Sequence, residues 1–177
     1  MTKSQATENS TTPLNISLES DLFIRTLFQE LSSSLLKVIG TDEASKFISV
    51  AAKNMGREVD RKYKSALQVY NLSREQVAQV LVDLKNRIQG DFYIIEESDE
   101  KIVFGNRTCP FADKVRNRPS MCMMTSNLFG SIAAENLGYA KVELQETIAQ
   151  GNAGCRVVIY LRLRKEAENS PGREYFK

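Results

Sequence analysis

The chain contains no histidine and no tryptophan. The absence of histidine excludes a Ser-His-Asp triad, a Cys-His pair, a histidine-ligated zinc ion and a histidine-ligated haem. Any general base must therefore be a carboxylate, a lysine, a tyrosine or a thiolate. Any bound metal must use thiolate or oxygen ligands.

Cysteine is scarce, and long apolar runs are missing. Three cysteines among 177 residues do not form a disulfide framework, and in a reducing compartment they are free thiols or ligands. No apolar run approaches the roughly 20 residues of a membrane-spanning helix, and the polar first twenty residues do not resemble a signal peptide. We therefore expect a cytoplasmic protein that does not act on membranes.

The charge is nearly balanced, with 24 basic and 22 acidic side chains and a net charge of +2. This balance does not indicate a nucleic-acid-binding surface. Apolar residues make up 42% of the chain, enough for a folded core. We expect one domain at residues 21–164, between flexible tails at residues 1–20 and 165–177.

Hydrophobic periodicity predicts four helices. The first ends at Gly40, and the third begins with a capping box of Ser73 and Gln76. Ser120 is expected to cap the fourth. The expected helices span residues 22–39, 41–67, 73–90 and 120–137.

Alternating segments predict four strands. "DFYIIEE" and "KIVFGN" form an expected hairpin, and "YAKVELQE" and "CRVVIYLRLR" form a second pair around the turn "GNAG". In the last strand Cys155 lies on the apolar side and Arg156 on the polar side. The order ααα-ββ-α-ββ predicts an α+β domain, with a four-stranded antiparallel sheet packed against helices.

The three cysteines are Cys109, Cys122 and Cys155, and each lies where an element begins or ends. They converge if these ends meet at one edge of the sheet. Three thiolates without histidine suit zinc or an iron–sulfur cluster, with Glu143 or Glu146 as a candidate fourth ligand. Reversible thiol oxidation is a further possibility, and burial as small apolar side chains is the simplest one.

Cys122 also has a distinct electrostatic setting. It lies in the first turn of its expected helix, where the helix dipole stabilises a thiolate. The nearby cations Lys114, Arg116 and Arg118 add to this effect. Cys122 is therefore the candidate for a thiol with a lowered pKa.

Several stretches carry a family resemblance. They are "QVAQVLVDLKNRI", "DFYIIEE", "GNRTCPFADKV" and "RPSMCMMTSNLFGSIAAENLGYAKVELQETIAQGNAGCRVVIYL". Over residues 20–163 the chain resembles the methanogen-output-domain family, small cysteine-bearing domains found alone or beside histidine kinase, receiver or phosphatase modules. It is more distantly similar to vinyl-reductase-type ligand-binding domains, whose superfamily includes the transport-particle subunits.

The distant resemblance implies a small or apolar ligand between helices and sheet, and in some members a structural zinc. Cys122 and Cys155 match two zinc cysteines of that pattern. The third pattern cysteine falls on Thr147, and the pattern's glutamate falls near Leu144, next to Glu143. The resemblance therefore implies a zinc shell that is incomplete unless Cys109 supplies the missing ligand.

These observations predict a non-enzymatic sensory or regulatory domain. A site of Cys109, Cys122 and Cys155 would receive the signal and alter the packing of the helix that begins at Ser120. A kinase- or phosphatase-type signalling protein would read that change in trans. Two alternatives remain: a cysteine- or cluster-dependent reductase-like enzyme, and a homodimeric interaction module using the stripe Phe23, Leu27, Leu31 and Leu35.

Overall fold

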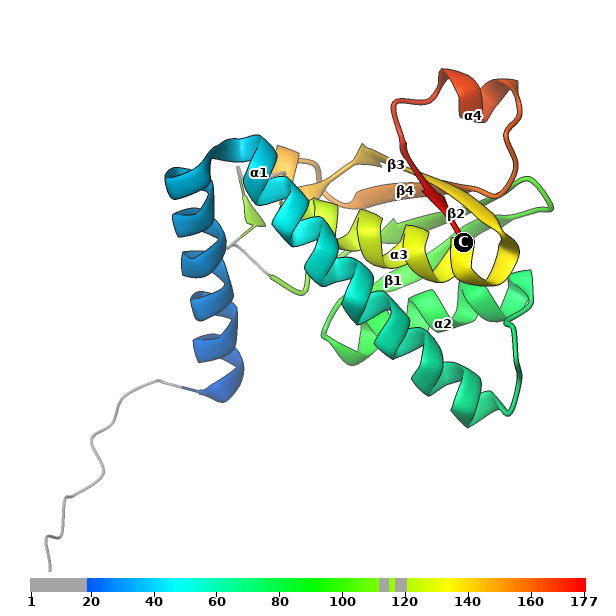
Figure 1. Cartoon of the computed structure of the whole chain (residues 1–177), viewed down its shortest axis with the longest axis horizontal. Helices are drawn as coiled ribbons and strands as arrows, with labels where there is room; N and C mark the ends of the chain where they lie inside the picture. Colours follow the sequence, from blue (N-terminus) through cyan, green and yellow to red (C-terminus); the bar gives the residue numbers. More distant parts are fainter. Residues whose placement is uncertain (1–18, 112–114, 117–120) are drawn as a thin grey trace, which may run out of the picture.

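The longest element is α1 (Ser20–Leu67), which combines the two helices expected on either side of Gly40. The backbone of Gly40 is not helical (φ 80°, ψ 169°) and kinks α1; a residue without a Cβ adopts this conformation readily. The first half of α1 leaves the body of the molecule, and the second half lies along α3 (Cys122–Leu137) (Figure 1).

The computed structural model describes residues 19–111, 115–116 and 121–177. Of the flexible tail expected at residues 1–20, residues 1–18 lie outside this part of the chain, and Ser20 already belongs to α1. The expected cap Ser120 and the cations Lys114 and Arg118 also lie outside it. None of the described helices is long and apolar enough to cross a membrane.

The predicted capping box is confirmed at the start of α2 (Arg74–Arg87). The backbone N–H of Gln76 donates to Ser73 Oγ at 3.2 Å, and the backbone N–H of Ser73 donates to Gln76 Oε1 at 2.9 Å. These two bonds satisfy donors that a helix N-terminus otherwise leaves unpaired. Beyond the helix, the Gly90 N–H donates to the Lys85 carbonyl at 2.9 Å.

The sheet is antiparallel throughout, with the strand order β1-β2-β4-β3-β5. The sequence predicted its first four strands. The strands are β1 (Phe92–Glu97), β2 (Lys101–Asn106), β3 (Tyr139–Glu146), β4 (Cys155–Tyr160) and β5 (Arg173–Phe176). A short 3-10 helix, η3 (Ile148–Gln150), joins β3 to β4.

The expectation of four strands and a flexible segment at residues 165–177 is wrong. This segment forms α4 (Lys165–Asn169) and β5, which pairs with β3 at the sheet edge. The pairing gives the segment backbone hydrogen bonds that a local sequence pattern does not reveal. The ring of Tyr175 packs so closely on Gly130 of α3 that a Cβ there would overlap it.

Both faces of the central strands are covered. One face packs against α1, α2 and α3 around Phe104, Phe129 and Ile159. On the other face, Val158 and Tyr160 are buried with Val103 and with Ala167 of α4. The sequence predicted that this face of β4 would be polar. It is largely buried instead, because the C-terminal segment folds over it.

The contact between Gly130 and Tyr175 predicts the effect of adding one methyl group. We expect Gly130→Ala to lower the free energy of unfolding by about 2 kcal/mol, because the new Cβ displaces the Tyr175 ring. In a Tyr175→Ala background the same change should raise stability by up to about 1 kcal/mol, because alanine favours helix. Urea unfolding of the four proteins measures both effects. A loss of equal size in the two backgrounds would contradict this packing.

Candidate functional site

The three cysteines meet in one pocket. Cys109 comes from the loop after β2, Cys122 is the first residue of α3, and Cys155 is the first residue of β4. The pocket has a volume of about 30 Å³, which is room for one or two water molecules. It is too small for an organic ligand of the kind that the distant resemblance implies.

Strand register brings the thiols together. Asn106 at the end of β2 pairs with Cys155 at the start of β4, so the chain continuing to Cys109 stays beside β4. The Cys155 Sγ accepts from Asn106 Nδ2 at 3.7 Å and from the backbone N–H of Ile148 at 3.4 Å. Asn106 is itself buried. Its side-chain oxygen also accepts from the Thr108 N–H at 3.1 Å, which shapes the loop that leads to Cys109.

Burial governs the protonation of two of the thiols. The pKa of Cys122 is raised to about 11, mainly by burial and also by the neighbouring Cys155 and Cys109. A hydrogen bond with Thr147 and the charge of Lys85 lower this pKa by less. Burial also raises the pKa of Cys109. Both side chains are therefore neutral thiols at pH 7. The prediction of a thiol with a lowered pKa at Cys122 is wrong, because loss of solvent outweighs the favourable charges around it.

A buried cation faces this thiol cluster. Lys85 of α2 is 3% exposed, and its ammonium interacts electrostatically with Cys109, Cys122 and Cys155. Its Nζ donates to Thr125 Oγ1 at 2.8 Å and lies 5.4 Å and 5.3 Å from the ring centroids of Phe92 and Phe129. Burial lowers the pKa of Lys85 to about 8 against the raising effect of the three cysteines.

Lys85 has no carboxylate partner among the described residues. The hydroxyl of Thr125 and the faces of two aromatic rings therefore replace a counter-ion. An uncompensated cation in a dry pocket favours negative charge nearby. Lys85 therefore offsets only part of the desolvation that keeps the thiols neutral, and its charge would favour an acidic oxidation product of a thiol.

The sequence did not identify Lys85 as part of the site. The signal was present, because Lys85 follows Leu81 by four residues and Val77 by eight, on the buried side of α2. The basic residue that starts the Cys109 loop has another role: Arg107 pairs with Asp91 at 3.1 Å and lies over the Tyr93 ring at 4.2 Å.

The donor set does not fit the predicted zinc ion or iron–sulfur cluster. Within the described part of the chain, no group of three or more Cys, Asp or Glu side chains is arranged to hold a metal. Leu144 and Thr147 line the pocket, whereas Glu143 instead accepts a hydrogen bond from the Tyr160 hydroxyl at 2.9 Å and Glu146 is exposed. A buried ammonium beside the thiols also repels a metal cation. The metal stays a prediction without support in this geometry.

Known proteins were found that resemble this chain in sequence or in fold. The model of the family described as MetOD1, methanogen output domain 1, matches residues 27–160. No curated protein matches the chain in sequence.

Two solved structures share the fold at 13% identity. The phenol-responsive sensory domain of the transcription activator PoxR, solved with phenol, has a TM-score of 0.63; the match covers 86% of this chain and 80% of that one. Trafficking protein particle complex subunit 3 from Naegleria fowleri, covalently bound to palmitic acid, has a TM-score of 0.57, with 89% and 97% covered. At this identity the likeness concerns the fold alone.

Because the ammonium of Lys85 is buried, its removal should raise the free energy of unfolding by an amount that depends on pH. The pKa of Lys85 is about 8 in the folded protein and 10.5 when solvated, so the unfolded state binds more protons between these pH values. The contribution of Lys85 to stability is therefore lowest below pH 8 and rises with pH up to about 10.5. We expect Lys85→Met to be about 2–3 kcal/mol more stable than the parent at pH 7 and nearly equal to it at pH 10.5.

Urea unfolding at the two pH values measures this difference. Titration of the cysteines affects both proteins and largely cancels. Lys62→Met is the control, because Lys62 is exposed on α1; its difference from the parent should stay small at both pH values. A gain from Lys85→Met that did not change with pH would contradict a buried ammonium.

Proposed function

The chain belongs to the methanogen output domain 1 family, and from this premise we propose that it is a non-enzymatic sensory domain whose thiol pocket receives the signal. Oxidation of the cysteines would be the input, and a signalling protein of the kinase or phosphatase type would read the output in trans. The fold shared with a phenol-responsive sensory domain supports a sensory role. The contact between the pocket and α1 carries the proposal.

That contact is made by the loop that bears Cys109. Phe111 stacks on Phe28 of α1 with ring centroids 5.6 Å apart and an interplanar angle of 15°. Both rings pack in the same cluster as Cys109 and Cys122. The first half of α1 therefore rests directly on the wall of the thiol pocket.

Polar contacts reinforce the same junction. The guanidinium of Arg25 on α1 donates to the carbonyl of Pro110, the residue after Cys109, and to Gln89 Oε1 at 2.5 Å. Arg25 also pairs with Asp21 at 2.9 Å. A shift of the Cys109 loop therefore changes stacking and hydrogen bonding at α1 together, and the kink at Gly40 allows the first half of the helix to move separately.

The proposed chemistry needs only a peroxide as oxidant. The thiols are mostly neutral at pH 7, so the attacking species is the minor thiolate fraction. It attacks an oxygen of hydrogen peroxide, the O–O bond breaks, and a sulfenic acid and hydroxide form. A second thiol then attacks that sulfur, a disulfide forms, and water leaves. In total two thiols lose two electrons and two protons. A pocket of about 30 Å³ has room for the added oxygen, so the movement of the loop comes from the second step, which draws two sulfur atoms to bonding distance.

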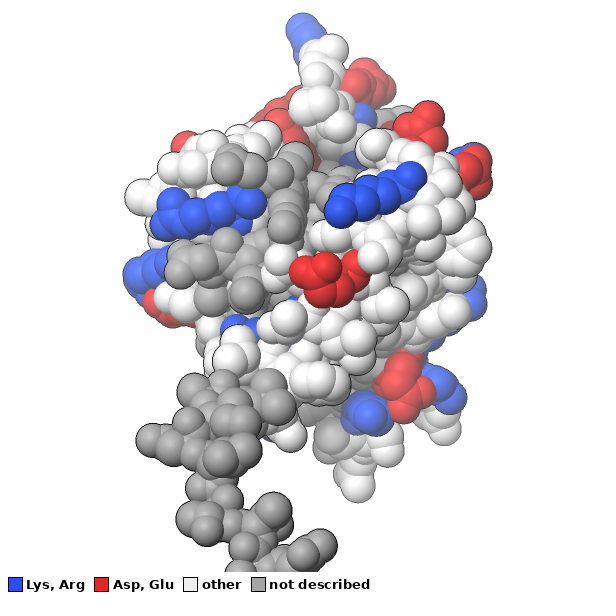
Figure 2. All heavy atoms as spheres, turned by 90° about the vertical axis from the view of Figure 1, so that its left-hand side faces the viewer, with Lys and Arg blue, Asp and Glu red and all other residues white. Residues whose placement is uncertain are grey.

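The output surface is the exposed side of the first half of α1. Phe23, Leu27 and Leu31 are 50%, 43% and 61% exposed. Figure 2 shows this side of the molecule, where acidic and basic side chains are spaced over a mostly uncharged surface. The same exposure favours the second candidate function, a homodimeric interaction module. The two candidate functions differ in one respect: only in the sensory domain does oxidation of the thiols change α1.

Hydrogen–deuterium exchange of residues 20–39 distinguishes them. After treatment with hydrogen peroxide, we expect exchange in this half of α1 to become at least about tenfold faster, which corresponds to a loss of about 1.4 kcal/mol of local stability. Exchange in α2 should not change. A protein with all three cysteines replaced by serine should show no response.

A matched pair of variants tests the route. Phe28→Ala removes the stacking on Phe111 and should give fast exchange in residues 20–39 before oxidation, with no further increase after it. Phe23→Ala, on the exposed side of the same helix, should respond like the parent. Unchanged exchange in a parent protein whose thiols are oxidised by mass would contradict the proposal and favour the interaction module.

A further inference from the structure

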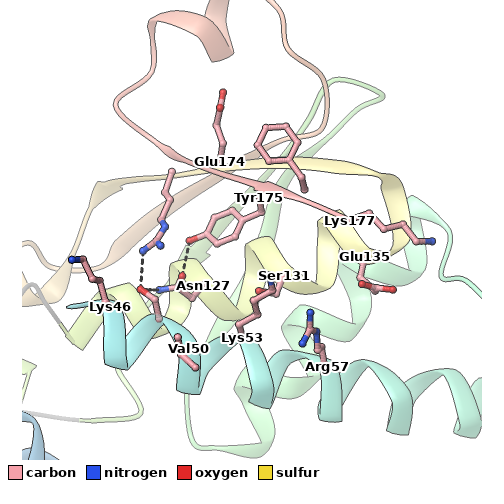
Figure 3. A pocket seen from close by; sticks show the side chains of 13 residues that line it. Lys46, Val50, Lys53, Arg57, Asn127, Ser131, Glu135, Glu174, Tyr175 and Lys177 are labelled. Carbon is pink, nitrogen blue, oxygen red and sulfur yellow. Dashed lines mark hydrogen bonds between the residues drawn. The ribbon is translucent and has the colours of Figure 1, made fainter. Parts of the chain in front are cut away.

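A second, larger cavity lies away from the thiol pocket, between the second half of α1, α3 and β5. It has a volume of about 630 Å³, within the range of small-molecule sites. Figure 3 shows Val50, Lys53 and Arg57 of α1 on one side and Tyr175 of β5 on the other. The strand that closes the cavity lies beyond residue 160, where the match to the family ends.

Basic side chains dominate the lining. They are Lys46, Lys53, Arg57, Arg173 and Lys177, against the carboxylates of Glu135 and Glu174. Glu174 points away from α1 in Figure 3, and its carboxylate accepts a hydrogen bond from Tyr139 at 3.1 Å. Within the described chain neither Lys53 nor Arg57 has an ion-pair partner. Lys46 pairs with Glu43 at 2.6 Å. Lys53 and Arg57 therefore supply the positive charge that no carboxylate of the described residues pairs with.

A buried polar network fixes the β5 side of the cavity. Arg173 Nη1 donates to Ser49 Oγ at 2.8 Å, and Asn127 Nδ2 donates to the same oxygen at 3.3 Å. The Tyr175 hydroxyl donates to Asn127 Oδ1 at 3.3 Å and lies 2.9 Å from Ser126 Oγ. Ser49, Asn127 and Ser126 are all buried. The guanidinium of Arg173 is thus held in place with further N–H donors still available.

The cavity also contains an unsatisfied polar atom. Ser131 Oγ is buried and has no hydrogen-bond partner in the described structure. It lies on α3 between the cationic α1 wall and β5, and it lines the cavity. Leaving such a hydroxyl unpaired costs about 1–3 kcal/mol. The oxygen is closed to solvent, so a ligand atom pairs with it and recovers this energy only if the Ser131 side chain turns toward the cavity.

We propose that this cavity binds a small organic anion with an apolar body. Its carboxylate or phosphate group pairs with Lys53 and Arg57, and Arg173, held at Ser49, adds positive charge to the same cavity. The apolar part lies against Val50 and the ring of Tyr175, and an acceptor on the ligand pairs with Ser131. The site is independent of the thiol pocket, so this assignment does not rest on the sensory function proposed above.

Binding of octanoate, measured by isothermal titration calorimetry, tests the assignment. Octanoate should bind the full chain with an affinity that falls as salt is raised, because exposed charges are screened. 1-Octanol, which has the same chain without the charge, should bind at least about tenfold more weakly. Octyl phosphate in place of octanoate identifies which anionic group is preferred, and inorganic phosphate alone should bind weakly, because it has no apolar body.

Variants locate the site. Arg57→Gln should weaken octanoate binding about tenfold, the effect of losing one charge-assisted hydrogen bond, and Arg57→Gln with Arg173→Gln should abolish it. Arg61→Gln, one turn further along α1 and outside the cavity, should bind like the parent. Arg57 is exposed, so its replacement should leave thermal unfolding unchanged. No binding by the parent, or equal binding by Arg57→Gln and the parent, would overturn the assignment.

Discussion

The structure around the site depends on one constraint: the ammonium of Lys85 is buried beside three thiols without a carboxylate partner in the described chain. It is stabilised by Thr125 and the ring of Phe129, both on α3, and by the ring of Phe92 on β1. The ammonium keeps these contacts only if α2, α3 and β1 pack as they do here. Its charge also affects the protonation of the three thiols. Burial keeps Cys109 and Cys122 neutral, and the ammonium beside them disfavours a bound metal cation.

This pocket is also a mechanical junction. The loop that carries Cys109 carries Pro110 and Phe111, the residues that hold Arg25 and Phe28 of α1. A chemical change at Cys109 therefore takes place next to the two residues that contact the first half of α1. This half of the helix presents an apolar surface to solvent. The larger cavity is lined by α1, α3 and β5, so α3 lines both sites but no residue belongs to both.

Local patterns predicted much of the fold. The capping box of Ser73 and the alternation of β1 to β4 follow from interactions between residues close in sequence. The meeting of Cys109, Cys122 and Cys155 was a possibility that only strand register could decide. β5 was missed because four residues carry too little periodicity, and its stability comes from β3 and Gly130. Likewise the raised pKa of Cys122 depends on burial, which sequence spacing does not reveal.

From this geometry we infer that Lys85 supplies the positive charge at the thiol cluster in place of a metal ion. The most direct test is metal, iron and sulfide analysis of anaerobically purified protein, together with its absorption spectrum and a thiol titration under denaturing conditions. We expect colourless protein with three titratable thiols and no stoichiometric metal. One equivalent of zinc, or brown protein with stoichiometric iron and sulfide that is lost when the cysteines are replaced, would contradict it.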